Sequence, residues 1–459
     1  MEQLPNEIFA SIFEFVCTNN LLQEYAEEKS VLTSLPAMVI TSVCSRWRDI
    51  GLGLPTLWSQ IQLKFSAQLQ PPRFISTVEL YLHRSADAPL TLHVEVRKKV
   101  QPFSQTQSEI PFILSLLTEH TQRWKVLHFT CDSPISSFSG FSRLSFPQLE
   151  EVGLTNRFAF VSGADLNCFN QAPKLRTALI ADPLVEAADF PWKQLTSLDI
   201  SAPDDIESLN VFQECPNLTV LKIRSQSSQP EILGAGVLLN RLQSLTFLLC
   251  EGEEINTQSL QENVLLTFTL PSLTEFRIIP PDECWGSVIF PAKVFTDFIT
   301  RSSCTLKTLC LSYVSITDLH LIEVLQHCPS IHNLSIVDCY LENPITTQLI
   351  SKMHVTHSLL IDSQSDFKSM SLLPNLRRLS LRSDFAAVEE TLLVSMIESR
   401  WFKPGSDLCA TMLTMGISCI RSVVLKFIER DVDMQVYKPL EVLDEQGLRV
   451  VVARASNME

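Results

Sequence analysis

In Leu218-Thr219-Val220-Leu221-Lys222-Ile223, apolar residues occupy the first, fourth and sixth places, directly after the turn residues Cys215-Pro216-Asn217. Side chains alternate along a strand, so Leu221 and Ile223 face the same side while Lys222 faces the other. A single unit of this kind leaves its apolar side open, and stacked copies close it into one continuous core. The stretch therefore predicts an array of stacked strands.

The same six-residue pattern recurs along the chain. Its first apolar place falls at residues 149, 175, 195, 218, 242, 273, 306, 331 and 376, and an earlier copy begins at Trp124. Most steps between copies lie near the roughly 20 to 29 residues of leucine-rich repeats, which the pattern resembles from about Trp124 to Leu381. The long step from 331 to 376 leaves room for a weaker copy that ends at Leu359-Leu360-Ile361.

This resemblance implies an α/β solenoid with short parallel strands inside and helices outside. Apolar residues with helical spacing between Ile316 and Leu325 predict one of the outer helices. Strict alternation from Pro89 to Val96 predicts a strand before the array, and Ser422–Phe427 and Gly447–Val452 predict two strands after it. The alternative is a helical core in which the leucines share this spacing by chance.

The first sixty residues predict two small amphipathic helices. Pro5 starts the first, whose apolar face comprises Ile8, Phe9, Ile12, Phe13 and Val16. The second begins at Pro36 and ends near Gly51 or Gly53, with an apolar stripe of Val39, Ile40, Val43, Cys44, Trp47 and Ile50. Helices of this size cannot bury enough surface to be very stable alone, so we expect them to need a partner.

These N-terminal residues resemble the F-box motif. The resemblance is carried by Leu4-Pro5, Glu7-Ile8, Ile12-Phe13 and Val43-Cys44-Ser45-Arg46-Trp47-Arg48, and Leu54-Pro55-Thr56-Leu57-Trp58 is similar to the segment that follows the box in large fungal families of F-box proteins. It implies a surface for a Skp-type adaptor, which links such proteins to a cullin-based ubiquitin ligase. The residues assigned to that surface or to the packing beneath it are Leu4, Pro5, Ile8, Phe9, Ile12, Phe13, Val43, Cys44 and Trp47.

A polar stretch from about Thr18 to Ser34 separates the two helices and lengthens the spacing between the two halves of the motif. The alternative is therefore a pair of helices that only caps the array, because a terminal repeat would otherwise expose its core edge.

The second, third and fifth places of each repeat point away from the core and predict a concave partner surface. Its charged candidates are Lys125, His128, Glu150, Glu151, Asp199, Lys222, Glu275, Arg277, Lys307, His332, Arg377 and Arg378. Both signs are mixed among them, which favours a folded protein partner over a polyanion. The alternative is that most of them are simply solvated strand residues.

Composition narrows the classes of function. The chain has 459 residues with a net charge of −15, which disfavours nucleic acid as a partner. Thirteen cysteines without a Cys-x-x-Cys pair indicate reduced thiols in a cytoplasmic or nuclear compartment, and no apolar run is long enough for a membrane span. Leu233-Gly234-Ala235-Gly236 lacks the third glycine of a dinucleotide loop. We find no catalytic, metal or cofactor motif, so no cofactor and no enzyme activity are expected.

Together these patterns predict an F-box domain at residues 1–60, a connecting region at 61–123, a repeat domain at 124–452 and a frayed tail at 453–459. The expected function is that of a non-catalytic substrate receptor in a Skp-cullin-F-box ubiquitin ligase, which binds the adaptor through the F-box and an unidentified protein target through the repeats. The alternative is a repeat scaffold whose N-terminal helices have no adaptor.

Overall fold

The computed structural model describes residues 4–18, 20–24, 35–67, 70–97, 111–138, 140–157, 160–181, 189–201, 207–224, 236–248, 257–280, 288–339, 342–355, 371–428 and 430–454. The chain divides into two compact units, Met1–Pro203 and Asp204–Glu459. The weaker repeat copy expected at Leu359-Leu360-Ile361 and most of the expected tail lie outside the described residues.

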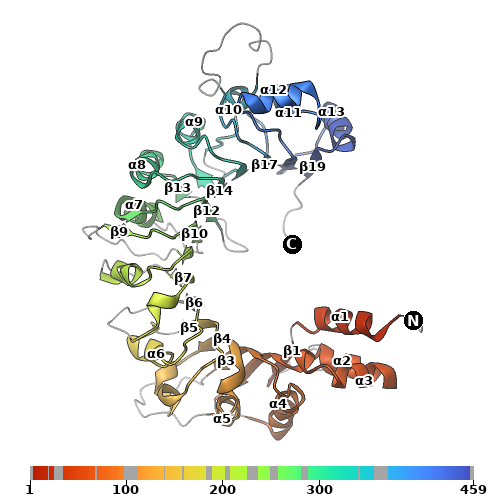
Figure 1. Ribbon diagram of the computed structural model, residues 1–459, viewed down its shortest axis with the longest axis vertical. Coiled ribbons are helices and arrows are strands. Elements are labelled where there is room, and N and C mark those ends of the chain that lie inside the picture. Colours follow the sequence, from red (N-terminus) through yellow and green to blue (C-terminus); the bar gives the residue numbers. More distant parts are fainter. Residues whose placement is uncertain are drawn as a thin grey trace. The chain divides into compact units, whose positions relative to one another are not determined.

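Among the described residues of the first unit, seven strands lie side by side in chain order, and every neighbouring pair is parallel (Figure 1). They are β1 (Asn20–Gln23), β2 (Gln60–Ser66), β3 (Leu90–Arg97), β4 (Trp124–Cys131), β5 (Glu151–Asn156), β6 (Thr177–Ile180) and β7 (Ser197–Ser201). Because β2 pairs with β3 and β3 pairs with β4, the series of parallel strands begins well before the expected start of the array at Trp124.

The helices of the first unit precede or connect these strands. They are α1 (Asn6–Val16), α2 (Pro36–Val43), α3 (Ser45–Leu52), α4 (Pro72–Arg84), α5 (Phe112–Thr118) and α6 (Gly163–Asn167), with 3₁₀ turns η2 (Pro55–Trp58), η3 (Thr121–Arg123), η4 (Ile135–Ser137), η5 (Phe141–Arg143) and η6 (Trp192–Gln194). The second predicted N-terminal helix is therefore two helices, broken at Cys44, whose backbone is extended.

The second unit continues the same construction. Eight of its described strands pair in parallel in the order β8 (Val220–Arg224), β10 (Ser244–Leu248), β12 (Glu275–Ile279), β14 (Thr308–Ser312), β16 (Asn333–Val337), β17 (Arg378–Ser383), β18 (Ser422–Phe427) and β19 (Arg449–Arg454). Two short parallel pairs lie beside them, β9 (Val237–Leu238) with β11 (Phe268–Thr269) and β13 (Val288–Ile289) with β15 (Val314–Ser315).

Helices cover one side of these strands and leave the other side without helices (Figure 1). The helices are α7 (Thr257–Thr267), α8 (Ala292–Ser302), α9 (Asp318–His327), α10 (Thr347–Met353), α11 (Glu390–Arg400), α12 (Asp407–Thr414) and α13 (Met434–Glu445), preceded by the 3₁₀ helix η7 (Glu207–Glu214). We call the side without helices the open face. The predicted helix between Ile316 and Leu325 is confirmed as α9.

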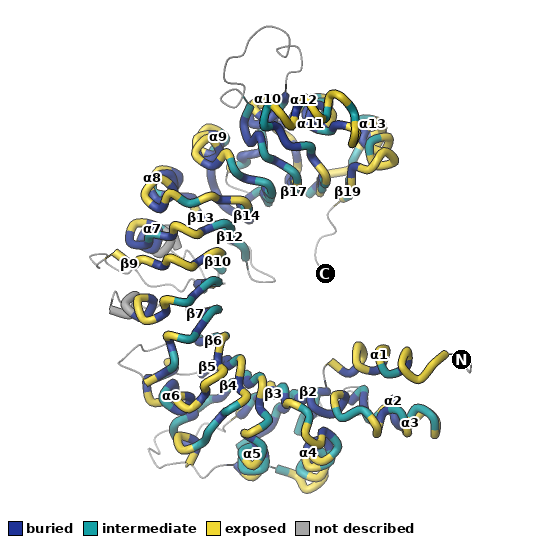
Figure 2. Tube along the Cα trace, viewed as in Figure 1, coloured by how far each residue is buried: buried dark blue, intermediate teal, exposed yellow. Residues whose placement is uncertain are grey.

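The repeat pattern predicts the strand positions accurately. Each of the nine predicted copies contains a strand that begins two residues after its first apolar place, as in Leu218 before β8. The fourth and sixth places form two buried columns, so that Leu221 lies opposite Leu245 and Ile223 lies opposite Phe247. Removing each such side chain from water contributes about 1.5–3 kcal/mol, which explains why this pattern survives where other places vary. In strands such as β12, β16 and β17, buried residues accordingly alternate with intermediate or exposed ones (Figure 2).

Two findings extend the predicted pattern. Ile420 is the buried first-place residue of β18, and buried Leu448 directly precedes β19, so both C-terminal strands predicted from sequence are confirmed as strands of the parallel series. In contrast, the N-terminal stretch expected to be a polar insert contains a strand. Asn20–Gln23 forms β1 and pairs with β2, and Leu22 is only 2% exposed. Four residues are too few to show a recognisable alternation, so their strand geometry depends on pairing with β2.

Candidate functional site

An aromatic cluster joins the first and third helices. The Trp47 ring centroid lies 5.7 Å from that of Phe9 and 5.1 Å from that of Phe13. Phe9 and Phe13 are 4% and 1% exposed, and Trp47 is half-buried. These three residues of the predicted adaptor site therefore lie in the packing beneath the helices, where they fix the position of α1 on α3.

Polar contacts fix the beginnings of α1 and α3. Arg46 Nη2 donates to the Leu4 carbonyl at 2.7 Å, and Arg46 Nε donates to Asn6 Oδ1 at 3.0 Å. Exposed Cys44 caps α3, because its Sγ accepts from the backbone N–H of Trp47 at 3.5 Å. Pro5 directly precedes α1. The motif residues thus hold the chain from Leu4 onward against α3.

Large apolar side chains remain exposed on α1, α2 and α3, which contact one another, and at Leu4 before α1. We call them the apolar helix face, and they are Leu4, Ile8, Ile12, Phe15, Val16, Val39, Val43 and Leu52. Phe15 is the most exposed, at 83%. Figure 2 shows exposed segments on α1, α2 and α3. Leu4, Ile8, Ile12 and Val43 were predicted for this site, whereas Phe15, Val16, Val39 and Leu52 were not.

The missed residues follow from helical spacing. Phe15 lies three residues after Ile12 and seven after Ile8, so the three share one side of α1. The sequence marks two apolar sides of this helix, and only the packing of Phe9 and Phe13 decides which of them is buried.

Asn20 at the start of β1 connects the helices to the first repeats. Its Nδ2 donates to the carbonyls of Cys17 at 3.2 Å, Leu57 at 3.0 Å and Gln60 at 3.0 Å. Its Oδ1 accepts from the Ala37 N–H at 3.3 Å and the Tyr81 hydroxyl at 3.2 Å. The side chain is fully buried, so losing these bonds would leave several polar groups without partners.

Trp58 strengthens the same junction. Its Nε1 donates to the Gly51 carbonyl at 2.9 Å, its ring meets Tyr81 edge-on at 5.0 Å, and the Arg84 guanidinium lies 4.4 Å from the ring centroid. The end of α3 is thereby attached to α4.

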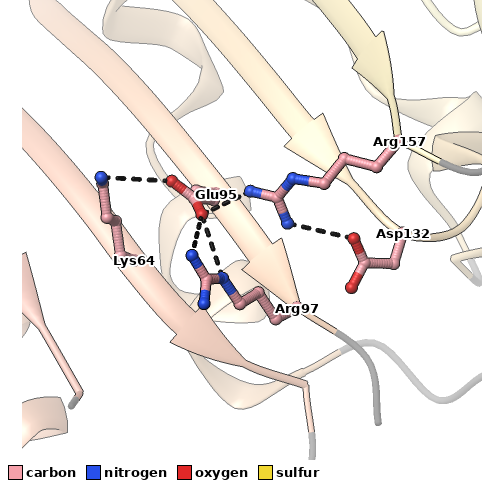
Figure 3. A network of polar contacts seen from close by, with 5 residues as sticks. All are labelled: Lys64, Glu95, Arg97, Asp132 and Arg157. Carbon is pink, nitrogen blue, oxygen red and sulfur yellow. Dashed lines mark hydrogen bonds and ion pairs between the residues drawn. The ribbon is translucent and has the colours of Figure 1, made fainter. Parts of the chain in front are cut away.

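Strands of the first unit carry charges that pair with one another (Figure 3). The Glu95 carboxylate contacts Lys64 at 3.4 Å, Arg97 at 3.1 Å and also Arg157, which reaches Asp132 at 3.0 Å. Partial burial by itself raises the pKa of Glu95, but the Arg97 hydrogen bond and the nearby Arg157 and Lys64 charges hold that pKa below its ordinary value. Every charge of the network therefore has an oppositely charged partner within it.

Two histidines extend this pairing. His128 Nε2 lies 2.7 Å from Glu151 Oε1, and its ring centroid lies 4.6 Å from that of His93. Burial first, and the neighbouring His128 second, lower the pKa of His93. Gly153 makes room for the His128 ring, because a Cβ at that position would lie 3.0 Å from His128 Cδ2. Lys125 and Glu150, also predicted partner residues, are 3.5 Å apart.

The twelve charged candidates divide between the two units. Lys125, His128, Glu150, Glu151 and Asp199 belong to the first unit, and Lys222, Glu275, Arg277, Lys307, His332, Arg377 and Arg378 belong to the second. All are half-buried or exposed, as expected for places that face away from the core. In the second unit Glu275 pairs with Arg277, whereas Arg377 and Arg378 have no ion pair among the described residues.

The chain was compared with known proteins, and neither a family model nor a curated protein matches it. The resemblance to the F-box and to leucine-rich repeats therefore stays a prediction. None of the described helices combines the length and apolarity needed to cross a bilayer. In the described part of the chain, no three His, Cys, Asp or Glu side chains are grouped closely enough to hold a metal ion.

Proposed function

We propose that this chain is the substrate-recognition subunit of a Skp-cullin-F-box ubiquitin ligase. The observation that carries the proposal is the apolar helix face, eight large apolar side chains exposed on α1–α3 and at Leu4, two residues before α1, in a chain of net charge −15. Exposed apolar clusters of this kind mark interaction surfaces. A Skp-type adaptor would cover the face and remove its side chains from water.

The energetics are sufficient for such a complex. Burying the exposed part of each of these side chains contributes about 1 kcal/mol, so eight of them offset much of the roughly 4–15 kcal/mol that association costs. Phe9, Phe13 and Trp47 support the face from beneath. Their role is to position the contacting residues.

The Asn20 and Trp58 contacts give the proposed function its mechanism. They join the helices to β2 and α4, so an adaptor bound at α1–α3 would be held at a fixed position relative to the first repeats. A target bound by the repeats would then be kept near the ligase, where its effective concentration is raised. This chain supplies position, and the other subunits supply the chemistry.

One observation favours the second candidate, a scaffold whose helices only cap the array. β1 lies between α1 and α2 in the chain and forms the first strand of the sheet, and its Asn20 side chain accepts from the Ala37 N–H of α2, so α2 adjoins the first strand. A cap alone gives no reason for Ile8, Ile12 and Phe15 to remain exposed.

The test is co-purification of the full chain with a Skp-type adaptor. The informative variant is Ile8→Glu with Ile12→Glu, because both side chains are exposed and their loss leaves the packing intact. The matched control is Phe112→Glu on α5, an apolar side chain of the same unit that is 52% exposed. A truncation before Gln60 is less suitable, because it removes β1 and the Asn20 contacts.

We expect the unaltered chain and the Phe112→Glu control to retain the adaptor, and the Ile8→Glu, Ile12→Glu variant to lose it while keeping its circular dichroism spectrum. If the unaltered chain retains no adaptor, the helices are a cap and the chain is a scaffold. Equal retention of the adaptor by all three proteins would mean that it does not bind at α1.

A further inference from the structure

The second unit carries a row of basic residues at the beginning of its last strands. We call Lys307, His332, Arg377, Arg421 and Arg449 the basic row. Each occupies the entrance to a successive repeat strand, from β14 to β19. Backbone bonds connect them in order, from His332 N to Lys307 O at 2.8 Å, Arg377 N to His332 O at 2.8 Å, Arg421 N to Arg377 O at 2.7 Å and Arg449 N to Arg421 O at 3.1 Å.

The geometry of the row follows from the sheet. Neighbouring strands are about 4.8 Å apart, so the five residues span about 19 Å across the strands. Arg378 adds a further exposed guanidinium beside the row. It shares its register with Ser422 and Arg449 on the next two strands, so a hydroxyl group lies between two arginines.

The charges of the row are not neutralised by the protein. Among the described residues, Lys307, Arg377, Arg378, Arg421 and Arg449 form no ion pair, and Lys307, Arg378, Arg421 and Arg449 are exposed. Two acidic residues end α13 before β19: Asp444 accepts from the Val450 N–H at 2.8 Å, and Glu445 forms no ion pair with Arg449. Asp338 and Asp384 follow β16 and β17 at the opposite ends of the strands. The five entrance positions and Arg378 are therefore all basic, unlike the mixed charge expected for the whole concave surface.

We propose that the basic row, with Arg378, binds an acidic extended segment of a partner protein. An extended chain rises about 3.3 Å per residue, so about six residues of such a segment would cross all five strands. Exposed guanidinium groups bind carboxylates and phosphates through paired hydrogen bonds, and both groups would suit this row. If the proposed ligase function is correct, the segment belongs to the target.

Direct binding to the full chain tests this inference without an adaptor. Three labelled peptides of eight residues serve as probes in fluorescence anisotropy, one rich in Asp and Glu, one with phosphoserines and one neutral. The test variant is Arg378→Gln, Arg421→Gln, Arg449→Gln. The control variant is Lys352→Gln, Lys403→Gln, Lys438→Gln, which removes the same charge from exposed positions elsewhere in the second unit.

We expect at least one anionic peptide to bind at least tenfold more tightly than the neutral peptide, with an affinity that falls as salt rises. The arginine variant should lose at least tenfold in affinity, and the lysine variant should lose less than threefold. The comparison of the carboxylate and phosphoserine peptides identifies which anion the row prefers.

Three results would overturn the proposal. The first is equal affinity for anionic and neutral peptides, and the second is an equal loss of affinity in the two variants. The third is a single-stranded oligonucleotide that binds more tightly than both anionic peptides and loses affinity in the arginine variant, which would assign the row to nucleic acid. Adaptor retention by the arginine variant is measured separately, so a failure here is distinguishable from a failure of the adaptor proposal.

Discussion

In the first unit, the Glu95 carboxylate contacts Lys64, Arg97 and Arg157, whereas in the second unit Arg378, Arg421 and Arg449 have no acidic partner among the described residues. Both sets lie on strands of the same repeat geometry, at places that face away from the core. The repeat therefore fixes where a charged side chain lies, and the neighbouring strands decide whether that charge is neutralised. Paired charges contribute to folding, while unpaired charges remain available to a ligand.

The largest effect is expected at Arg400, the arginine that is fully buried among the described residues of the second unit. Arg400 donates to the carbonyls of Met353, Leu373 and Leu372, and burial lowers its pKa to about 10. Arg400→Met removes the side-chain donors of these carbonyls, of which Leu373 O keeps the Leu376 N–H at 3.2 Å, so we expect a loss of about 2–4 kcal/mol in the free energy of unfolding. Urea unfolding measures the loss, and exposed Lys403→Met is the control. A change below about 1 kcal/mol would mean that the carbonyls find other donors.

A smaller loss is expected from the paired region. Glu95→Gln removes the negative charge that three cationic side chains share, and these cations then repel one another. We expect the first unit to lose about 1–2 kcal/mol, less in 1 M salt, measured by hydrogen exchange in peptides from β2–β5 of the full chain. Unchanged exchange in these peptides would show that the network adds nothing to stability and would remove the contrast between the units.

A weaker effect is expected from pH. Because the pKa of His93 is lowered in the folded state, the unfolded chain binds its proton first, so stability is fully present above about pH 6.5 and is lost as pH falls below that value. His128 and Glu151 face the same site and are left unchanged. His93→Gln should show a smaller loss of stability between pH 7.5 and 5.5 than the unaltered chain, by thermal unfolding. The effect is below that of Glu95→Gln, because solvent screens a half-exposed ring. Identical losses would place the acid sensitivity elsewhere.

The smallest effect on stability is expected in the basic row. Arg378→Gln should change the free energy of unfolding by less than about 0.5 kcal/mol, because no ion pair is lost. Hydrogen exchange in peptides from β17 and β18 provides the measurement. A loss as large as that of Glu95→Gln would mean that Arg378 has a structural role, and the difference between the two units would disappear.

Much of the repeat fold could be predicted from the sequence, because first, fourth and sixth apolar places are a local signal that strand geometry translates directly into a buried column. β1 could not be predicted, since Asn20–Gln23 becomes a strand only by pairing with β2. The apolar helix face was half predicted. Ile8 and Ile12 belong to the motif, but Phe15 and Val39 are exposed only because of how the three helices pack.

The sequence by itself determined the places that make the core and therefore the position of each repeat strand, because burial of apolar side chains at a fixed spacing leaves one register. It also placed Arg377 and Arg378 away from that core. Only the tertiary structure decided which charges meet, since Glu95 and Arg157 are 62 residues apart in sequence and are joined across strands. The same strand register brings Arg378, Ser422 and Arg449 together from three separate repeats, because backbone pairing aligns equivalent places whatever the length of chain between them.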